Sequence, residues 1–300
     1  MNRPKISSGA FRNPSFRRFW KMKRMGTFIL RASIFLGLAF YLQACDTLKT
    51  SKEPKNMPMP EKISIKKTVK PPLDMSAPDK TETATFALGW FWGPDSRFGS
   101  IKGVIRTRVG YAGGTKKNPT YHTLGDHTES IQVDYDPKVI SYEKLLKVFW
   151  DSHDPSTPSW SIQYMAAIFF HDNEQKRLAL ISMDQAKSGE KRFYTKIFPL
   201  TEFYPAENYH QKHRLRSDRD LMREFNAMYP LQEDFMNSTT AARINGYLYG
   251  YGSMEVLKKE LPGFGLSPAA GKKLVEIVKK RKGKIALALW DRQKEFECRK

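Results

Sequence analysis

Residues 83–95 read TATFALGWFWGPD, and this stretch carries the clearest structural signal in the 300-residue chain. Its first half, through Leu88, is a short, largely apolar run with β-branched residues, which is typical of a buried strand. Three aromatic residues at 90–92 come next, and then Gly93-Pro94-Asp95, where a proline favours the first turn of a helix. We therefore predict a strand that passes directly into a helix, with the aromatic residues at the turn between them.

The segments that follow show the same mixture of apolar strands and amphipathic helices. Residues 130–135 alternate apolar and polar side chains, as a half-buried strand does. The patterns predict strands over residues 103–111, 130–135 and 165–170, a helix that begins at Ser141, and a second helix capped by Asn173. Because these elements alternate irregularly, we predict an α+β fold with a mixed, mostly antiparallel sheet covered by helices over residues 81–215. A helical C-terminal extension follows over residues 216–300.

The charge of the chain is concentrated at its two ends. The formal net charge is +20, with 51 basic and 31 acidic residues, and 40% of the residues are hydrophobic. Residues 1–44 contain nine basic residues and no acidic residue, and residues 272–300 contain eleven basic and four acidic residues. A nucleic-acid-binding protein normally carries its basic face on the folded core. We therefore expect no nucleic-acid partner, and we expect a monomer.

The N-terminus has the features of an export signal. An apolar run of eleven residues, 32–42, follows several basic residues and is too short to span a bilayer. Leu42-Gln43-Ala44-Cys45 resembles the lipobox of bacterial lipoproteins, in which the cysteine is lipid-modified; the alternative is a chance cysteine after an ordinary cleavage site. We predict a signal peptide over 1–44 and a flexible, proline-containing tether over 45–80. The protein would be anchored by lipid in the bacterial cell envelope and face outside the cytoplasm.

Only two cysteines are present, so a lipid-modified Cys45 leaves Cys298 without an intramolecular disulfide partner. We interpret Cys298 as a free cysteine, although a resolving thiol is the alternative. Glu207, His210 and His213 have a spacing that a metal site on a helix could use. We favour a role for them in orienting the wall of a pocket, and we predict neither a metal nor a cofactor.

Beyond these single features, the sequence resembles the peptide methionine sulfoxide reductases of the A type, which are specific for the S-sulfoxide. The resemblance covers about residues 83–214. The matching segments are Ala87-Leu88-Gly89-Trp90-Phe91-Trp92, Gly110-Tyr111-Ala112-Gly113-Gly114, Asn118-Pro119-Thr120-Tyr121, His127-Thr128-Glu129, Tyr135-Asp136-Pro137, His153-Asp154-Pro155, Gln163-Tyr164 and Phe203-Tyr204-Pro205-Ala206-Glu207-Asn208-Tyr209-His210-Gln211. The resemblance implies a ferredoxin-like reductase core and a reaction in which a cysteine attacks the sulfoxide sulfur. A second thiol and a thioredoxin-like reductant then restore the cysteine.

The nucleophile of the family follows the glycine of the first motif, and here that position holds Trp90. An indole has no ionisable nucleophile, so Trp90 cannot carry out this chemistry. The resemblance implies that Glu129 is the acid, and that Tyr111 and Tyr164 are the two phenols that bind and protonate the sulfoxide oxygen. It also implies that residues 91 and 92 hold the methyl group of the substrate.

Phe91 and Trp92 are suited to that role because aromatic walls match a small apolar group. A carboxyl group beside them, such as that of Glu129, would have its pKa raised by desolvation, the condition for donating a proton near neutral pH.

Three hypotheses follow. The first is a repair enzyme that reduces methionine sulfoxide in exported proteins, in which Trp90 is a UGA codon for selenocysteine that was translated as tryptophan. The second is a catalytically inactive family member that binds oxidised methionine. The third is an interaction lipoprotein that uses only the scaffold. The joint presence of Glu129, Tyr111 and Tyr164 argues against the third. The amino-acid sequence does not decide between the first two; we take the family's reaction as the function, and we predict that a protein with a genuine Trp90 does not reduce methionine sulfoxide.

Overall fold

The computed structural model describes residues 70–187 and 192–281. The predicted signal peptide, Cys45, most of the predicted tether and Cys298 lie outside these residues. Within the described ranges, no helix is both long enough and apolar enough to cross a membrane.

The described strands form one mixed six-stranded sheet in the order β5-β4-β1-β3-β2-β6. The strands are β1 (Glu82–Leu88), β2 (Val104–Ala112), β3 (Thr128–Tyr135), β4 (Ala166–Phe170), β5 (Lys196–Pro199) and β6 (Phe203–Pro205). Only β4 and β5 pair in parallel; the other neighbours are antiparallel. With helices α2 (Trp92–Gly99) and α3 (Tyr142–Trp150), the four central strands follow the chain order β1-α2-β2-β3-α3-β4, which is the ferredoxin-like arrangement. The predicted α+β class and core are confirmed.

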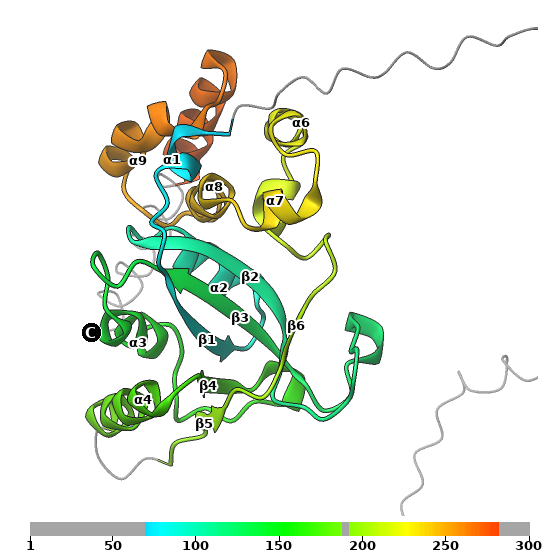
Figure 1. Ribbon diagram of the computed structural model, residues 1–300, viewed down its shortest axis with the longest axis vertical. Coiled ribbons are helices and arrows are strands. Elements are labelled where there is room, and N and C mark those ends of the chain that lie inside the picture. The colour runs from blue at the N-terminus through cyan, green and yellow to red at the C-terminus, as the bar shows by residue number, and fades with distance from the viewer. Residues whose placement is uncertain (1–69, 188–191, 282–300) are drawn as a thin grey trace, which may run out of the picture. The chain divides into compact units, whose positions relative to one another are not determined.

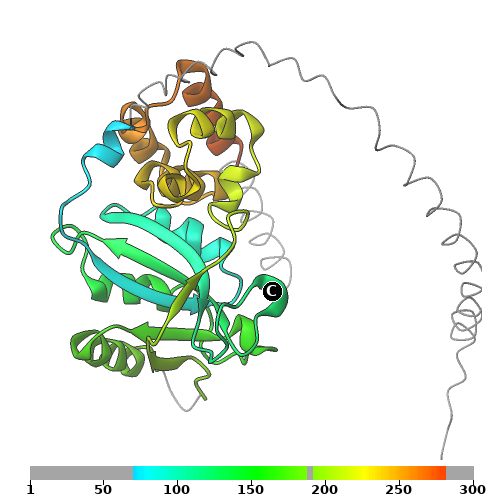
Figure 2. The ribbon, with the colours of Figure 1, turned by 45° about the vertical axis from the view of Figure 1, so that its right-hand side comes forward.

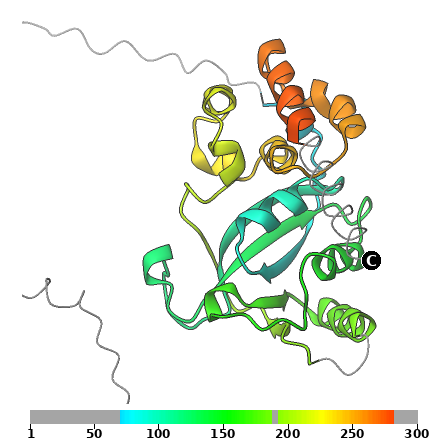
Figure 3. The ribbon, with the colours of Figure 1, turned by 180° about the vertical axis from the view of Figure 1, so that it is seen from behind.

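The main core lies between this sheet and the helices over one of its faces. Phe86 of β1 stacks on Phe98 of α2 and contacts Phe149 of α3, with ring centroids 5.3 Å apart in both pairs. All three side chains are fully buried, and each such burial stabilises the fold by about 1.5–3 kcal/mol. Figure 3 shows α2 lying over the strands, and Figure 1 shows α3 beside α4 (Asn173–Ala186) near the β4–β5 edge.

The C-terminal part is helical, as predicted, and has a hydrophobic core of its own. Its helices are α5 (His213–Arg216), α6 (Arg219–Met228), α7 (Gln232–Met236), α8 (Thr239–Tyr249) and α9 (Met254–Glu260), and residues 268–281 are also helical. Figure 2 shows these helices grouped together at one end of the sheet. Helix α8 packs closely on α2 through two glycines. A Cβ atom added at Gly99 would lie 2.6 Å from the carbonyl oxygen of Ala242, and one at Gly246 would lie 2.6 Å from that of Ser96.

Three local features differ from the sequence predictions. Helix α4 is capped by the side chain of Asp172, which accepts a hydrogen bond from the N–H of Gln175, and not by Asn173. The edge strands β5 and β6 have no counterpart in the predicted pattern because each has only three or four residues. Residues 72–75 form the short helix α1 (Pro72–Met75) within the segment that we expected to be a tether. The carboxylate of Asp74 fixes α1 because it accepts hydrogen bonds from the C-terminal helical part.

Candidate active site

The turn from β1 into α2 holds the three aromatic residues side by side. Gly89 has a φ of +72°, in the left-handed region that favours glycine, and this allows the strand to turn into the helix. Phe91 is only 1% exposed, whereas Trp90 is 59% exposed. The indole of Trp90 stacks on that of Trp92, with ring centroids 5.2 Å apart and an interplanar angle of 26°. The residue at position 90 therefore projects from a rigid turn toward the surface.

Glu129 lies next to this turn and is fully buried. One of its carboxylate oxygens accepts the backbone N–H of Phe91 at 3.2 Å, and the other accepts the side-chain amide of Gln163 at 2.9 Å. Burial raises the pKa of Glu129 above its usual value, although these two hydrogen bonds oppose the shift. The carboxyl group can therefore hold a proton at a higher pH than an exposed glutamate can. It is bonded to the backbone of Phe91, the residue after position 90.

Tyr111 is the register partner of Glu129 across β2 and β3, so the two side chains lie on the same face of the sheet. The fully buried Tyr111 donates its hydroxyl proton to a carboxylate oxygen of Glu207 at 2.7 Å. The other oxygen of Glu207 accepts the N–H of Tyr121 at 2.9 Å. Burial and the nearby Glu207 both raise the pKa of Tyr111, so the phenol keeps its proton throughout the neutral range.

Trp92 is held by two histidines. Its indole N–H donates to Nδ1 of His210 at 3.3 Å, and the ring of His213 stacks on it with centroids 3.7 Å apart. Because an indole nitrogen only donates, Nδ1 of His210 is the acceptor, and the neutral imidazole carries its proton on Nε2. Burial lowers the pKa of His210, which favours this neutral form. The two histidines thus orient a pocket wall, as the sequence indicated.

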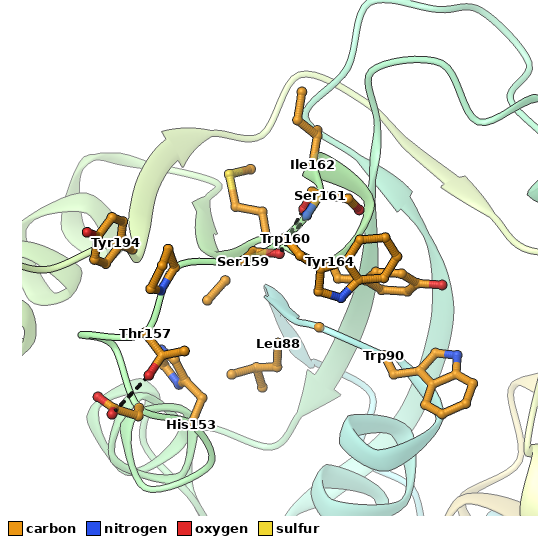
Figure 4. A pocket seen from close by; sticks show the side chains of 15 residues that line it. Leu88, Trp90, His153, Thr157, Ser159, Trp160, Ser161, Ile162, Tyr164 and Tyr194 are labelled. Atoms are coloured by element: carbon orange, nitrogen blue, oxygen red, sulfur yellow. Dashed lines mark hydrogen bonds between the residues drawn. The ribbon is translucent and has the colours of Figure 1, made fainter. Parts of the chain in front are cut away.

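Tyr164 lies at the rim of the site, on the short 3₁₀ turn Ile162–Tyr164. Partial burial, with contributions from the Tyr121 hydroxyl and the Glu129 carboxyl, raises its pKa to about 12. Tyr164 and Trp90 also line a cavity of about 780 Å³ that extends away from the aromatic turn (Figure 4). The structure thus brings the six predicted residues Trp90, Phe91, Trp92, Tyr111, Glu129 and Tyr164 to one region, although only the first and last line this cavity.

Sequence reasoning missed a buried polar cluster behind the turn. Asp95 of α2 and Lys212 are both fully buried, and the Lys212 ammonium lies 3.3 Å from the Asp95 carboxylate. Asn245 of α8 donates to Asp95 at 3.2 Å and to Ser96 at 3.0 Å, and its side-chain oxygen accepts the N–H of Leu215 at 3.0 Å. These bonds tie the helix that begins at Trp92 to the C-terminal helical part. The sequence signal available was the acidic Asp95 directly after the aromatic turn. Lys212 stands among other polar and charged residues, so no local pattern reveals its burial or its pairing with Asp95.

The spacing of Glu207, His210 and His213 left a metal site as the alternative that we did not favour. Among the described residues, no group of three or more His, Cys, Asp and Glu side chains could hold a metal ion.

A buried acid next to a strand-helix turn, two phenols and an aromatic wall define a site that can hold a small polarised oxygen beside a methyl group. The family model that matches residues 82–242 is "Peptide methionine sulfoxide reductase", and a second model, "Selenoprotein methionine sulfoxide reductase A, helical domain", matches residues 231–280. The chain belongs to the peptide methionine sulfoxide reductase family, of the A type.

Several curated relatives and solved structures are similar to this chain. A peptide methionine sulfoxide reductase from Drosophila melanogaster is 44% identical over 189 residues, which cover 62% of this chain and 76% of the relative. An MsrA from Methanococcus maripaludis is 41% identical over 152 residues, covering 47% of this chain and 97% of the relative. The crystal structure of reduced Mxr1 from Saccharomyces cerevisiae has a TM-score of 0.41 and 33% identity, covering 45% of this chain and 84% of that one.

Proposed function

We propose that this protein reduces methionine-S-sulfoxide residues in exported proteins, as a repair enzyme, and that its nucleophile is a selenocysteine at position 90. Membership of the family supports the reaction. The supporting groups of the site are present and close together: the buried Glu129, the phenol of Tyr111 and the wall of Trp92. The observation that carries the proposal is that Glu129 accepts the N–H of Phe91, the residue directly after position 90.

The selenolate at position 90 attacks the sulfoxide sulfur and forms a selenium–sulfur bond, while Glu129 donates a proton to the oxygen. The hydroxyl group then passes from sulfur to selenium, so the sulfur–oxygen and selenium–sulfur bonds break. The selenium supplies the two electrons that restore the methionine thioether. The oxygen leaves on the nucleophile as a selenenic acid. One thiol of a dithiol reductant of the thioredoxin class displaces water from it, and the second thiol forms the disulfide and restores the selenolate.

Two observations support selenocysteine over a genuine tryptophan. The indole of Trp90 is 59% exposed and its described ring contact is with Trp92, so the fold gains little packing from it. The helical part over residues 231–280 matches a family model described as belonging to a selenoprotein. A UGA codon that was read as tryptophan would account for both.

The export and anchoring part of the proposal rests on the sequence alone. The basic and apolar segments that precede Leu42-Gln43-Ala44-Cys45 support a lipoprotein signal, and the prolines after Cys45 support a tether. The enzyme would then act on proteins outside the cytoplasm and be held at the membrane by lipid.

Sequencing codon 90 and measuring the mass of the natively expressed protein test the proposal. A UGA codon and the mass of selenocysteine would support it, and a UGG codon would contradict it. Recombinant protein with Trp90 should show no turnover of methionine sulfoxide, whereas the Trp90→Cys variant should turn it over with dithiothreitol. An inactive Trp90→Cys variant that still folds would contradict the enzymatic role.

The second candidate is a catalytically inactive family member that binds oxidised methionine or acts as an envelope interaction lipoprotein. A UGG codon at position 90 would favour it, because an indole has no ionisable nucleophile, although the Trp90 ring stacked on Trp92 then covers part of the methyl-binding wall. Binding of methionine sulfoxide to the Trp90 protein, without turnover, would distinguish this candidate.

A further inference from the structure

The cavity beside the aromatic turn shares Trp90 and Tyr164 with the candidate active site, and its other lining residues lie outside that site. It has a volume of about 780 Å³, which is within the range of ligand pockets. Figure 4 shows Trp90 and Tyr164 at one end of this cavity, and His153 and Tyr194 at the other, with Leu88 between them. The cavity therefore begins at the candidate active site and leads away from it.

Most of the lining is apolar or aromatic, and part of it is unusually open to solvent. Trp160 is 82% exposed and Ile162 is 59% exposed. Trp160 lies on the loop before the 3₁₀ turn Ile162–Tyr164, and Ile162 begins that turn. The ring centroids of Trp160 and Tyr164 are 4.9 Å apart. Large apolar side chains that gather at one exposed place mark an interaction site more often than single scattered ones do.

The charged and titratable side chains of the lining do not favour a charged occupant. Nδ1 of His153 donates to the carbonyl oxygen of Phe149 at 3.0 Å, and Nε2 accepts from the hydroxyl of Thr195 at 2.8 Å. Burial lowers the pKa of His153, so the ring is neutral. The carboxylate of Asp154 accepts three hydrogen bonds from Ser156 and Thr157 in its own loop.

We propose that this cavity, termed the flank pocket and bounded by Trp160, Ile162 and Leu88, binds an apolar side chain one or two residues from the oxidised methionine in a substrate polypeptide. This inference rests on the proposed function. One residue of an extended chain spans about 3.3 Å, so a neighbour of a methionine held at Trp90 and Tyr164 reaches the pocket without a turn. The pocket would therefore favour substrate segments that carry an apolar residue beside the oxidised methionine.

The test measures how fast the full-length Trp90→Cys protein reduces two blocked peptides with a central methionine sulfoxide. One peptide has leucines beside the methionine sulfoxide, and the other has alanines. Dithiothreitol is the reductant, so docking of a protein reductant does not contribute. The leucine peptide should have a kcat/KM about tenfold higher, because burying part of a leucine side chain stabilises its complex. Ile162→Ser and Trp160→Ala should each reduce this ratio to about twofold or less. The matched control is Leu231→Ser, at an exposed leucine outside the pocket, and it should keep the tenfold ratio.

Failure of the inference differs from failure of the proposed function. Turnover of both peptides at equal kcat/KM, or a ratio that Ile162→Ser leaves unchanged, would overturn the pocket and leave the reductase intact. If no peptide is reduced, binding is measured instead. The NMR chemical shifts of the backbone amides of residues 157–166 in the Trp90 protein are followed as each peptide is added. They should move more with the leucine peptide than with the alanine peptide, and equal or absent shifts would overturn the inference. A dimer that dissociates on Ile162→Ser would assign the pocket to a second copy of the chain and would likewise overturn it.

Discussion

The indole of Trp90 stacks on the indole of Trp92, with ring centroids 5.2 Å apart. Trp92 also stacks against His213, at 3.7 Å, and its N–H is bound to His210. The aromatic wall that would hold a methyl group is therefore fixed in orientation and partly covered by the residue at the position of the nucleophile. A small nucleophile at position 90 would uncover that part of Trp92 and leave its orientation unchanged.

The first prediction concerns this covered wall. Trp90→Ala should bind methionine sulfoxide about fourfold more tightly than the Trp90 protein, because one more methyl-sized group can be buried against Trp92. Isothermal titration calorimetry measures the change in affinity. Leu231→Ala, at an exposed leucine on another part of the surface, should leave the affinity as it was. Equal affinities for Trp90→Ala and the Trp90 protein would show that the indole does not cover the binding surface.

The second prediction concerns the proton donor. In the Trp90→Cys background, Glu129→Gln should lower kcat/KM for methionine sulfoxide by about 10²–10⁴-fold, because the amide cannot donate a proton to the oxygen. The exposed Glu143→Gln is the control and should keep full activity. A Glu129→Gln variant as active as its parent would remove the carboxyl group from the mechanism.

The raised pKa of Glu129 also predicts the sign of a stability change with pH. A carboxyl group whose pKa is raised by folding favours the folded state at low pH, and this contribution is lost as the pH rises from about 4.3 through the folded-state pKa. The free energy of unfolding of Glu129→Gln, measured in urea, should therefore increase relative to that of its parent as the pH increases. A difference in unfolding free energy that is constant with pH would contradict the shift.

The third prediction concerns Asn245, whose hydrogen bonds join α2 to the C-terminal helical part. Asn245→Ala should lower the free energy of unfolding by about 2–4 kcal/mol, because Asp95 loses a buried donor and the N–H groups of Arg214 and Leu215 lose their acceptor. Thermal unfolding followed by circular dichroism measures the loss. The exposed Asn208→Ala should change the unfolding temperature little, and a similarly small effect of Asn245→Ala would contradict the role of the cluster.

The fourth prediction concerns the stability of the fold at low pH. Burial lowers the pKa values of His153, His171, His210 and His213 below the usual value. The unfolded chain then binds more protons than the folded one, so stability should fall as the pH decreases from about 6.5. His210→Asn should make this fall shallower in urea titrations between pH 7 and 5, because the variant loses one of the side chains that take up a proton on unfolding. A slope equal to that of the parent protein would exclude His210 as a source of the effect.

The sequence by itself determined the central elements of the fold and provided the candidates for the site residues. The apolar run before Gly89 gave β1, and period-two alternation gave β3, because such patterns depend on local burial and backbone preference alone. The short edge strands were not predicted from the sequence. Strand β6 forms through pairing with β2, and its three residues are too few to show an alternation of apolar and polar side chains. The segment of α1 likewise looks like a linker, since its helix is fixed by the distant Tyr229 and Thr240.

Only the tertiary structure decided how the site residues act on one another. Tyr111 and Glu129 are 18 positions apart in the sequence and become direct neighbours through the register of β2 and β3. The raised pKa of Glu129 depends on its complete burial, and the cluster of Asp95, Lys212 and Asn245 joins segments more than 100 residues apart. Local sequence specifies strands and turns through short-range sterics and burial pattern, whereas desolvation and the pairing of buried charges depend on groups that only the folded chain brings together.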